Sequence, residues 1–335
     1  MEEQKPQTPL RSKITIIILS ISCAILAAAL VLLLLAQYLR NNRSVSTIAT
    51  LQSSIDELKE ETIPIKTFKE HAQQYGASIP FLQSFFDDVI VYKNDNGIVY
   101  LPIDDSLPKN DYDFSMLTYN DGEIQYDHNG ITALKGIDVS KYQGNIDWKA
   151  VKADGVSYAF IRAGLRGYGA SGMISSDPYC EKNLKGASEA GVDIGVYFYS
   201  QAISKAEAIE EAEFVLDAIE GYEIKYPIVF DLEEVAAEGA RTAGMTAQQI
   251  TEVTIAFCER IKQAGYTPMI YGNIDWMAEH LILSELTEYD KWFAQYFNKP
   301  FFPYEFQIWQ YTASGKVDGI KGNVDLNLCF KNYAE

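Results

Sequence analysis

The longest apolar run of the chain lies near its N-terminus. No charged residue occurs between Lys13 and Arg40, and Ile14 to Ala36 is almost entirely Ile, Leu, Ala and Val. About 20 apolar residues cross a bilayer as one helix. A cleaved signal peptide would have a shorter apolar core and a small-residue cleavage site, which this run lacks. We therefore predict an uncleaved transmembrane helix over residues 14–37.

The residues that flank this run suggest its orientation and a stalk behind it. Basic residues lie on both sides, and their count leans toward a cytoplasmic tail over residues 1–13. The rest of a single-pass membrane protein would then lie outside the cell. Ile48, Leu51, Ile55 and Leu58 follow heptad spacing, which predicts a helical stalk over residues 38–80. Two heptads are too few for a coiled coil, so a solvated spacer helix is the alternative and the oligomeric state is left open.

Two hairpin patterns follow the stalk. Short β-prone runs flank Asn96-Gly97, and a second pair of runs between Phe114 and Tyr126 flanks Asn120-Asp121-Gly122. We predict a small β-rich module over residues 81–130. It serves either as a spacer or as a ligand-binding module, and nothing in its residues favours ligand binding.

From Gly136 onward, short β-branched runs alternate with helical stretches, as in parallel strands joined by crossover helices. The predicted strands cover residues 136–139, 158–162, 194–198, 227–231, 268–271, 291–296, 306–310 and 324–326. The predicted helices cover residues 178–190, 205–219 and 247–264, and later connections are too short for full helices. The pattern predicts an α/β fold, an irregular TIM-like β/α barrel over residues 134–335.

Polar and aromatic side chains lie at the carboxyl ends of these strands, which share one face of a β/α barrel. They are Asp138, Arg162, Tyr197, Asp231, Glu233, Tyr271, Gln295, Trp309 and Asp325. Asp231 and Glu233 are two residues apart and point to the same side of a continuing strand. One carboxylate can then raise the pKa of the other and keep it protonated as a general acid.

Each of these residues also has a purely structural interpretation. An isolated Asp-x-Glu is usually a solvated turn, Asp138 could cap a helix, and Asp325 could belong to a surface turn. Tyr197, Tyr271 and Trp309 either pack in the core or stack against sugar rings. Arg162 is expected to hold a carboxylate of the site in place.

Composition excludes several classes of protein. The chain has 28 Lys plus Arg against 46 Asp plus Glu, a net charge of -18, which argues against nucleic acid as a partner. Its three His and four Cys are scattered, without the spacing of a zinc site, and we expect no metal and no cofactor. We expect the cysteines beyond the apolar run to be buried thiols that need no disulfide.

Residues Gly136 to about Tyr333 resemble family 25 glycoside hydrolases, lysozymes of the N,O-diacetylmuramidase type. The matching segments are Gly136-Ile137-Asp138-Val139-Ser140, Gly144-Asn145-Ile146-Asp147-Trp148, Phe160-Ile161-Arg162-Ala163-Gly164, Gly195-Val196-Tyr197-Phe198-Tyr199, Pro227-Ile228-Val229-Phe230-Asp231-Leu232-Glu233, Ile270-Tyr271-Gly272-Asn273, Trp309-Gln310-Tyr311 and Val324-Asp325-Leu326-Asn327. The chain differs from the related chitinase pattern D-x-x-D-x-D-x-E at Tyr226 and Val229, which disfavours chitinase activity.

The resemblance implies a β/α barrel with some antiparallel character late in the sheet. It also implies cleavage of the β-1,4 bond between N-acetylmuramic acid and N-acetylglucosamine in peptidoglycan. Glu233 would be the general acid and Asp231 its partner, with Asp138 and Asp325 as supporting acids. We expect Tyr197, Tyr271, Trp309, Gln310 and Arg162 to bind the substrate.

Two questions of function stay open from the sequence. Asp231 acts either as a nucleophile or by orienting the 2-acetamido group of the substrate. Its spacing of about 6.6 Å from Glu233 lies between the ~5.5 Å of retaining pairs and the wider gap of inverting pairs, and we favour substrate-assisted retention. The alternatives to a muramidase are a catalytically silent glycan-binding or scaffold protein of the cell wall, and a glycosidase for another N-acetylated polymer.

Overall fold

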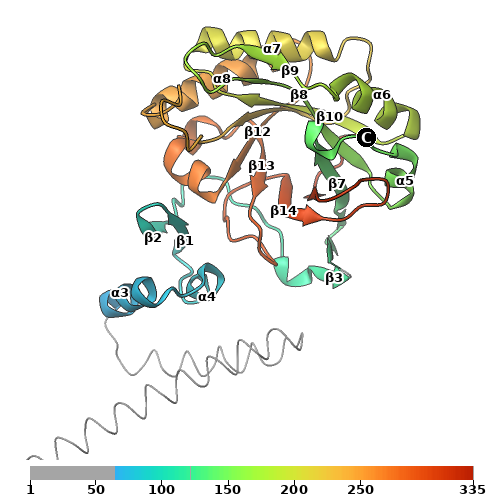
Figure 1. Ribbon diagram of the computed structural model, residues 1–335. Helices are drawn as coiled ribbons and strands as arrows, with labels where there is room; N and C mark the ends of the chain where they lie inside the picture. Colours follow the sequence, from blue (N-terminus) through green and yellow to red (C-terminus); the bar gives the residue numbers. More distant parts are fainter. Residues whose placement is uncertain (1–64, 121, 335) are drawn as a thin grey trace, which may run out of the picture. The chain divides into compact units, whose positions relative to one another are not determined.

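The computed structural model describes residues 65–120 and 122–334 (Figure 1). The chain divides into two units, residues 1–71 and 72–335, and helix α3 (Ile65–Tyr75) crosses the division. The predicted cytoplasmic tail, the transmembrane helix over residues 14–37 and residues 38–64 of the stalk lie outside the described residues. Within residues 65–120 and 122–334, no helix has the length and apolar character required to span a membrane.

A nine-stranded sheet forms the centre of the second unit, and eight of its strands close into a barrel. These strands are β7 (Leu134–Val139), β8 (Tyr158–Arg166), β10 (Asp193–Ser200), β11 (Ile228–Leu232), β12 (Pro268–Asn273), β13 (Asp290–Ala294), β14 (Ile308–Gly315) and β15 (Val324–Cys329). Pairing of β8 with β10 closes the ring, and β9 (Ile174–Ser176) adds an antiparallel edge to β8. The predicted barrel is confirmed, with every predicted strand present.

The last strand makes the barrel irregular, as the resemblance implied. Strand β15 runs antiparallel to both β14 and β7, whereas the other barrel pairs are parallel. The first residues of β15 therefore lie at the carboxyl ends of its neighbours. This direction places Asp325 directly opposite Asp138.

Four helices accompany the barrel strands. Helices α6 (Cys180–Ala190), α7 (Lys205–Ala218) and α8 (Ala247–Gln263) agree with the three predicted helices, and α7 lies beside α8 outside the sheet (Figure 1). The short α5 (Trp148–Ala153), capped by the Asp147 side chain, was not predicted. Only single turns accompany the remaining connections: η2 (Lys141–Gln143), the π-helical turn η3 (Trp276–His280) and η4 (Leu283–Glu285).

Side chains alternate between two apolar layers along the strands, as the strand period of two requires. The inner layer is Tyr158, Phe160, Tyr197, Tyr226, Val229, Met269, Trp292, Ile308 and Cys329. Intervening residues such as Ile161, Phe230, Phe293 and Trp309 belong to the larger outer cluster. Residues two positions apart in one strand therefore point to the same side of the sheet.

Residues before the barrel form the two predicted hairpins and a third, shorter strand pair that was not predicted. The elements are α4 (Ile79–Gln83), β1 (Val89–Asn94), β2 (Gly97–Pro102), η1 (Phe114–Met116), β3 (Thr118–Asn120), β4 (Glu123–Gln125), β5 (Asp127–His128) and β6 (Ile131–Thr132). Tyr112 stacks on Phe330 with ring centroids 4.4 Å apart, and the Asn110 side chain donates to the carbonyls of Phe302 and Tyr304. This segment therefore packs directly against the barrel.

The three described cysteines lie in three different elements of this unit. Cys180, Cys258 and Cys329 are buried and free. The expectation of buried thiols is therefore confirmed for these three residues.

Candidate active site

Four carboxyl groups meet at one face of the barrel. Asp138 lies near the end of β7, Asp231 near the end of β11, Glu233 just beyond β11, and Asp325 near the start of β15. Asp138 and Asp231 are buried, whereas Glu233 and Asp325 are partly exposed. Each of these carboxyls lies within the electrostatic influence of at least one of the others. The structure thus brings together all four predicted acids.

The cluster holds protons that isolated carboxyls would release. Burial, together with the neighbouring Asp325, raises the pKa of Asp138 to about 8, and burial raises that of Asp325 to about 6. Burial and the Asp325 charge also raise the pKa of Glu233. Burial and the charges of Glu233 and Asp138 raise the pKa of Asp231 well above its ordinary value. A proton donor is therefore present in this cluster near neutral pH.

Buried amides hold Asp138 in position. Its Oδ2 accepts hydrogen bonds of 2.9 Å from Gln310 Nε2 and 2.9 Å from Asn327 Nδ2. Gln310 Oε1 in turn accepts from the hydroxyls of Tyr271 at 3.0 Å and Tyr296 at 2.8 Å. Gln310 therefore lies in the site as expected, whereas Asn327 and Tyr296 were not predicted as site residues.

Tyr271 and Tyr197 contribute to both the core and the site. The Tyr271 hydroxyl also lies within hydrogen-bonding reach of Glu233, and donation to that carboxyl opposes the rise in its pKa. Both tyrosine rings pack edge-on against Trp292, at centroid distances of 4.8 Å for Tyr271 and 6.3 Å for Tyr197. Each has one end in the inner core and lies close to Asp138 and Asp231.

Trp309 does not face the site, and the expected stacking on a sugar is wrong for this side chain. It is 0% exposed, belongs to the outer core, and donates from Nε1 to the carbonyl of Gln295 at 2.9 Å. Its neighbour Gln310 faces the carboxylates, and adjacent strand residues point to opposite sides. Gln295 itself accepts from the Phe301 amide through Oε1.

Arg162 holds a carboxylate in place, but not one of the four predicted acids. Its Nε and Nη2 lie 2.8 Å and 2.7 Å from Asp177 Oδ2, and the Asp177 side chain is fully buried. Asp177 also accepts from the amides of Lys141 and Tyr179. Arg162 still acts on the site because its charge opposes the rise in the pKa of Asp231.

A separate open cavity of about 690 Å³ lies between α5, α6 and residues 319–321. Trp148, Lys149 and Glu189 are among its lining residues, and none of the four clustered carboxyls lines it. The chemistry-bearing groups are therefore in the carboxylate cluster and not in this cavity.

Comparison with known proteins agrees with this geometry. The family model described as glycosyl hydrolases family 25 matches residues 137–320. The autolytic lysozyme of Clostridium acetobutylicum is 29% identical over 195 residues, which cover 58% of this chain and 55% of that protein. Lysozyme M1 of Streptomyces globisporus is 27% identical over 206 residues, covering 58% of this chain and 67% of the relative. The chain thus spans about half the length of the Clostridium relative.

Solved structures show the same fold. The modular autolysin LytC of Streptococcus pneumoniae, in complex with a synthetic peptidoglycan ligand, aligns with a TM-score of 0.55 at 22% identity. The alignment covers 73% of this chain and 57% of that one. The spore cortex lytic enzyme SleM of Clostridium perfringens aligns with a TM-score of 0.52 at 19% identity, over 59% of this chain and 67% of that one.

Proposed function

This chain belongs to glycosyl hydrolases family 25, and from that membership we propose that it hydrolyses the glycan strands of peptidoglycan. The expectation of a glycoside hydrolase is confirmed at the level of the family. We further propose that it cleaves the β-1,4 bond between N-acetylmuramic acid and N-acetylglucosamine. The observation that carries this proposal is the cluster of four carboxyls with raised pKa values around Glu233.

Glu233 has the properties of the general acid. It is partly exposed, so a substrate can reach it, and its raised pKa favours the protonated form that a general acid needs. In the proposed first step, this proton passes to the glycosidic oxygen while the bond from that oxygen to the anomeric carbon breaks. The resulting Glu233 carboxylate later accepts a proton from the attacking water.

Asp231 is suited to assist through the substrate's own 2-acetamido group. Its Oδ1 is buried and has no hydrogen-bond partner among residues 65–120 and 122–334. An acetamido N–H that donated to this oxygen would stabilise the ionised form of Asp231 and leave the shared proton on Glu233. The acetamido oxygen would then attack the anomeric carbon, with retention of configuration after hydrolysis.

Loss of turbidity of purified cell walls tests the catalytic assignment. We expect Glu233→Gln to abolish the activity of the full chain, whereas Glu234→Gln, a change at the adjacent exposed carboxylate, should leave it intact. Equal activity of wild type and Glu233→Gln would refute this role for Glu233. Binding of walls without cleavage by the wild type would instead support the silent glycan-binding or scaffold protein.

Identification of the new reducing ends tests the substrate. N-acetylmuramic acid at the reducing end of the products is the expected result. Reducing-end N-acetylglucosamine, or cleavage only of another N-acetylated polymer, would contradict the proposed bond specificity.

We also propose that residues 14–37 anchor the protein as a single-pass membrane helix, with residues 1–13 cytoplasmic and the barrel outside. The support is the uncharged apolar run itself. A tether would keep an acidic enzyme of net charge -18 close to an anionic wall. Retention in membranes after alkaline extraction, with the barrel accessible to protease on intact spheroplasts, is the expected result. A mature N-terminus beyond residue 37 would show a cleaved signal peptide.

A further inference from the structure

The main chain at Glu233 lies just beyond the end of its strand. Strand β11 pairs with β10 as far as Leu232, which lies opposite Ser200. At the next residue, a side-chain hydrogen bond replaces the pairing between main chains. Gln201 Nε2 donates to the carbonyl of Glu233 at 3.1 Å and to that of Ser200 at 2.8 Å. The amide of Gln201 thus extends the hydrogen bonding between the two strands to Glu233.

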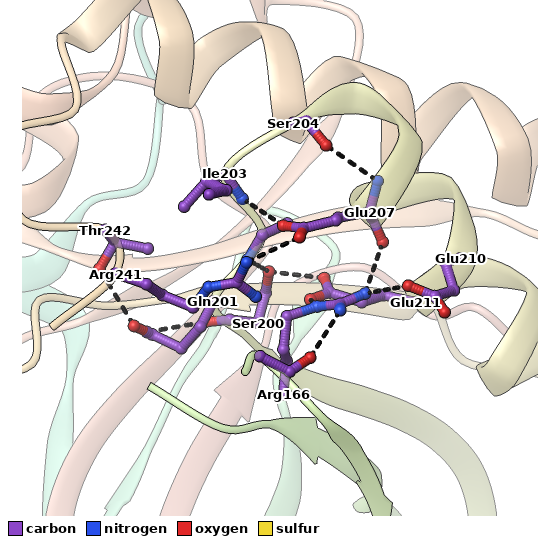
Figure 2. A network of polar contacts seen from close by, with 12 residues as sticks. Arg166, Ser200, Gln201, Ile203, Ser204, Glu207, Glu210, Glu211, Arg241 and Thr242 are labelled. Atoms are coloured by element: carbon purple, nitrogen blue, oxygen red, sulfur yellow. Dashed lines mark hydrogen bonds and ion pairs between the residues drawn. The ribbon is translucent and has the colours of Figure 1, made fainter. Parts of the chain in front are cut away.

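Gln201 is itself fixed in one orientation. It is fully buried, and its Oε1 accepts a hydrogen bond of 3.0 Å from Thr242 Oγ1 (Figure 2). The carbonyls of Ser200 and Glu233 can only accept, so the amide nitrogen of Gln201 must face them and its oxygen must face the Thr242 hydroxyl. Because Thr242 lies in the segment between Glu233 and α8, Gln201 binds this segment at two places.

A charged network behind the site holds the same elements together (Figure 2). Glu211 of α7 accepts hydrogen bonds of 2.6 Å from Ser200 Oγ and 2.6 Å from Arg166 Nε, and it accepts a further one from the main-chain N–H of Gln201. Arg241, next to Thr242, pairs with Glu207 at 2.7 Å. One network of hydrogen bonds and ion pairs therefore joins the ends of β8 and β10, helix α7 and the segment after Glu233.

We propose that Gln201 is a positioning residue for catalysis, resting on the proposed role of Glu233 as the general acid. Its amide holds the peptide unit of Glu233 so that the carboxyl reaches the glycosidic oxygen and stays beside Asp325 and Tyr271. Gln201 does not itself need to touch the substrate. Loss of its amide allows the Glu233 segment to relax, which changes proton transfer and leaves the rest of the glycan site in place.

Gln201→Met in the full chain tests this role, because methionine has a similar length and no strong hydrogen-bonding group. Displacement of a reacting group by about 1 Å can cost up to about 100-fold in rate. We expect kcat to fall by about 10- to 100-fold, with KM within about threefold of wild type. The basic limb of the pH profile should move, because Glu233 leaves the neighbours that set its pKa.

Gln307→Met is the matched control. The Gln307 side chain also holds a main-chain group near a strand end, because it accepts a hydrogen bond of 2.8 Å from the Lys291 amide. Lys291, however, lies near the start of β13 and therefore away from the carboxylate face. We expect this variant to lose stability at most, with kcat and the pH profile unchanged. A fall in kcat as large as that of Gln201→Met would refute a specific role for Gln201.

Two further measurements separate this inference from the proposed function. If Glu233→Gln is inactive and Gln201→Met keeps wild-type kcat and pH profile, only the inference fails. If Glu233→Gln stays active, the proposed function fails. Carbon NMR titration of the Glu233 carboxyl then tests the inference by itself. An unchanged pKa of Glu233 in Gln201→Met would overturn the inference. Should Gln201→Met not fold, Thr242→Val frees one end of the same amide, and the same shift of the basic limb is required of it.

Discussion

The buried carboxyl of Asp138 makes stability depend on pH. Its ordinary pKa is 3.8 and its pKa in the folded protein is about 8. Between these values the folded protein keeps a proton that the unfolded chain releases. Unfolding therefore becomes more favourable as the pH rises. The loss of folding stability caused by ionising Asp138 is absent below about pH 4 and is complete above about pH 8.

Asp138→Asn removes this cost while keeping the hydrogen bonds. The asparagine oxygen can accept from both Gln310 and Asn327, as the carboxylate oxygen does now. A pKa shift of one unit corresponds to about 1.36 kcal/mol. Because the neighbouring acids share the proton, the full shift of Asp138 is not recovered by changing this residue alone. We therefore expect a gain in the free energy of unfolding of about 2 to 4 kcal/mol at about pH 8, and little change at about pH 4.

Urea unfolding of the full chain, followed by tryptophan fluorescence at both pH values, measures the effect. The control is Asp105→Asn, a change at a carboxylate whose side chain is 88% exposed, which should leave the pH dependence as in wild type. Equal pH dependence in wild type and Asp138→Asn, or destabilisation by the same amount at both pH values, would refute the reasoning.

Three further substitutions test other contacts. Asp325→Asn should move the basic limb of kcat/KM to lower pH, because the Asp325 charge raises the pKa of Glu233; an unmoved limb would point to a different proton donor. Trp309→Phe should lower the free energy of unfolding by about 1 to 3 kcal/mol and leave KM unchanged, and a large rise in KM would contradict its place in the core. Arg162→Met should destabilise the protein by about 3 to 5 kcal/mol in urea unfolding because it leaves Asp177 buried and unpaired, so a loss below about 1 kcal/mol would show that the ion pair is dispensable.

The barrel and its acids could be predicted because both depend on local periodicity. Each strand is an apolar run of its own, and Asp231 and Glu233 share a side because they are two residues apart. Asn327 is likewise two residues from Asp325 in β15, so both side chains point to the same side of the sheet. Trp309 and Gln310 are adjacent in a strand, so only one of the two can face the site. The sequence itself therefore argued against placing Trp309 there together with Gln310.

Other features depend on contacts that carry no local signal. Asp177, the partner of Arg162, follows the three-residue strand β9, which is too short to show a period. The six-residue α5 is likewise too short for a helical pattern. Gln201 lies just beyond a strand, and its proposed role depends on where β11 ends, which a hydrophobic pattern places only to within a few residues.

The reversed direction of β15 places a loop at the face that carries the carboxylates. Strand β14 ends and β15 begins at the face that carries the carboxylates, so residues 316–323 start and finish there without a crossover helix. Insertions or exchanges within this loop can change the surroundings of the carboxylates while the ring of strands stays closed. If the proposed function holds, residues 316–323 are where engineering of glycan preference can begin.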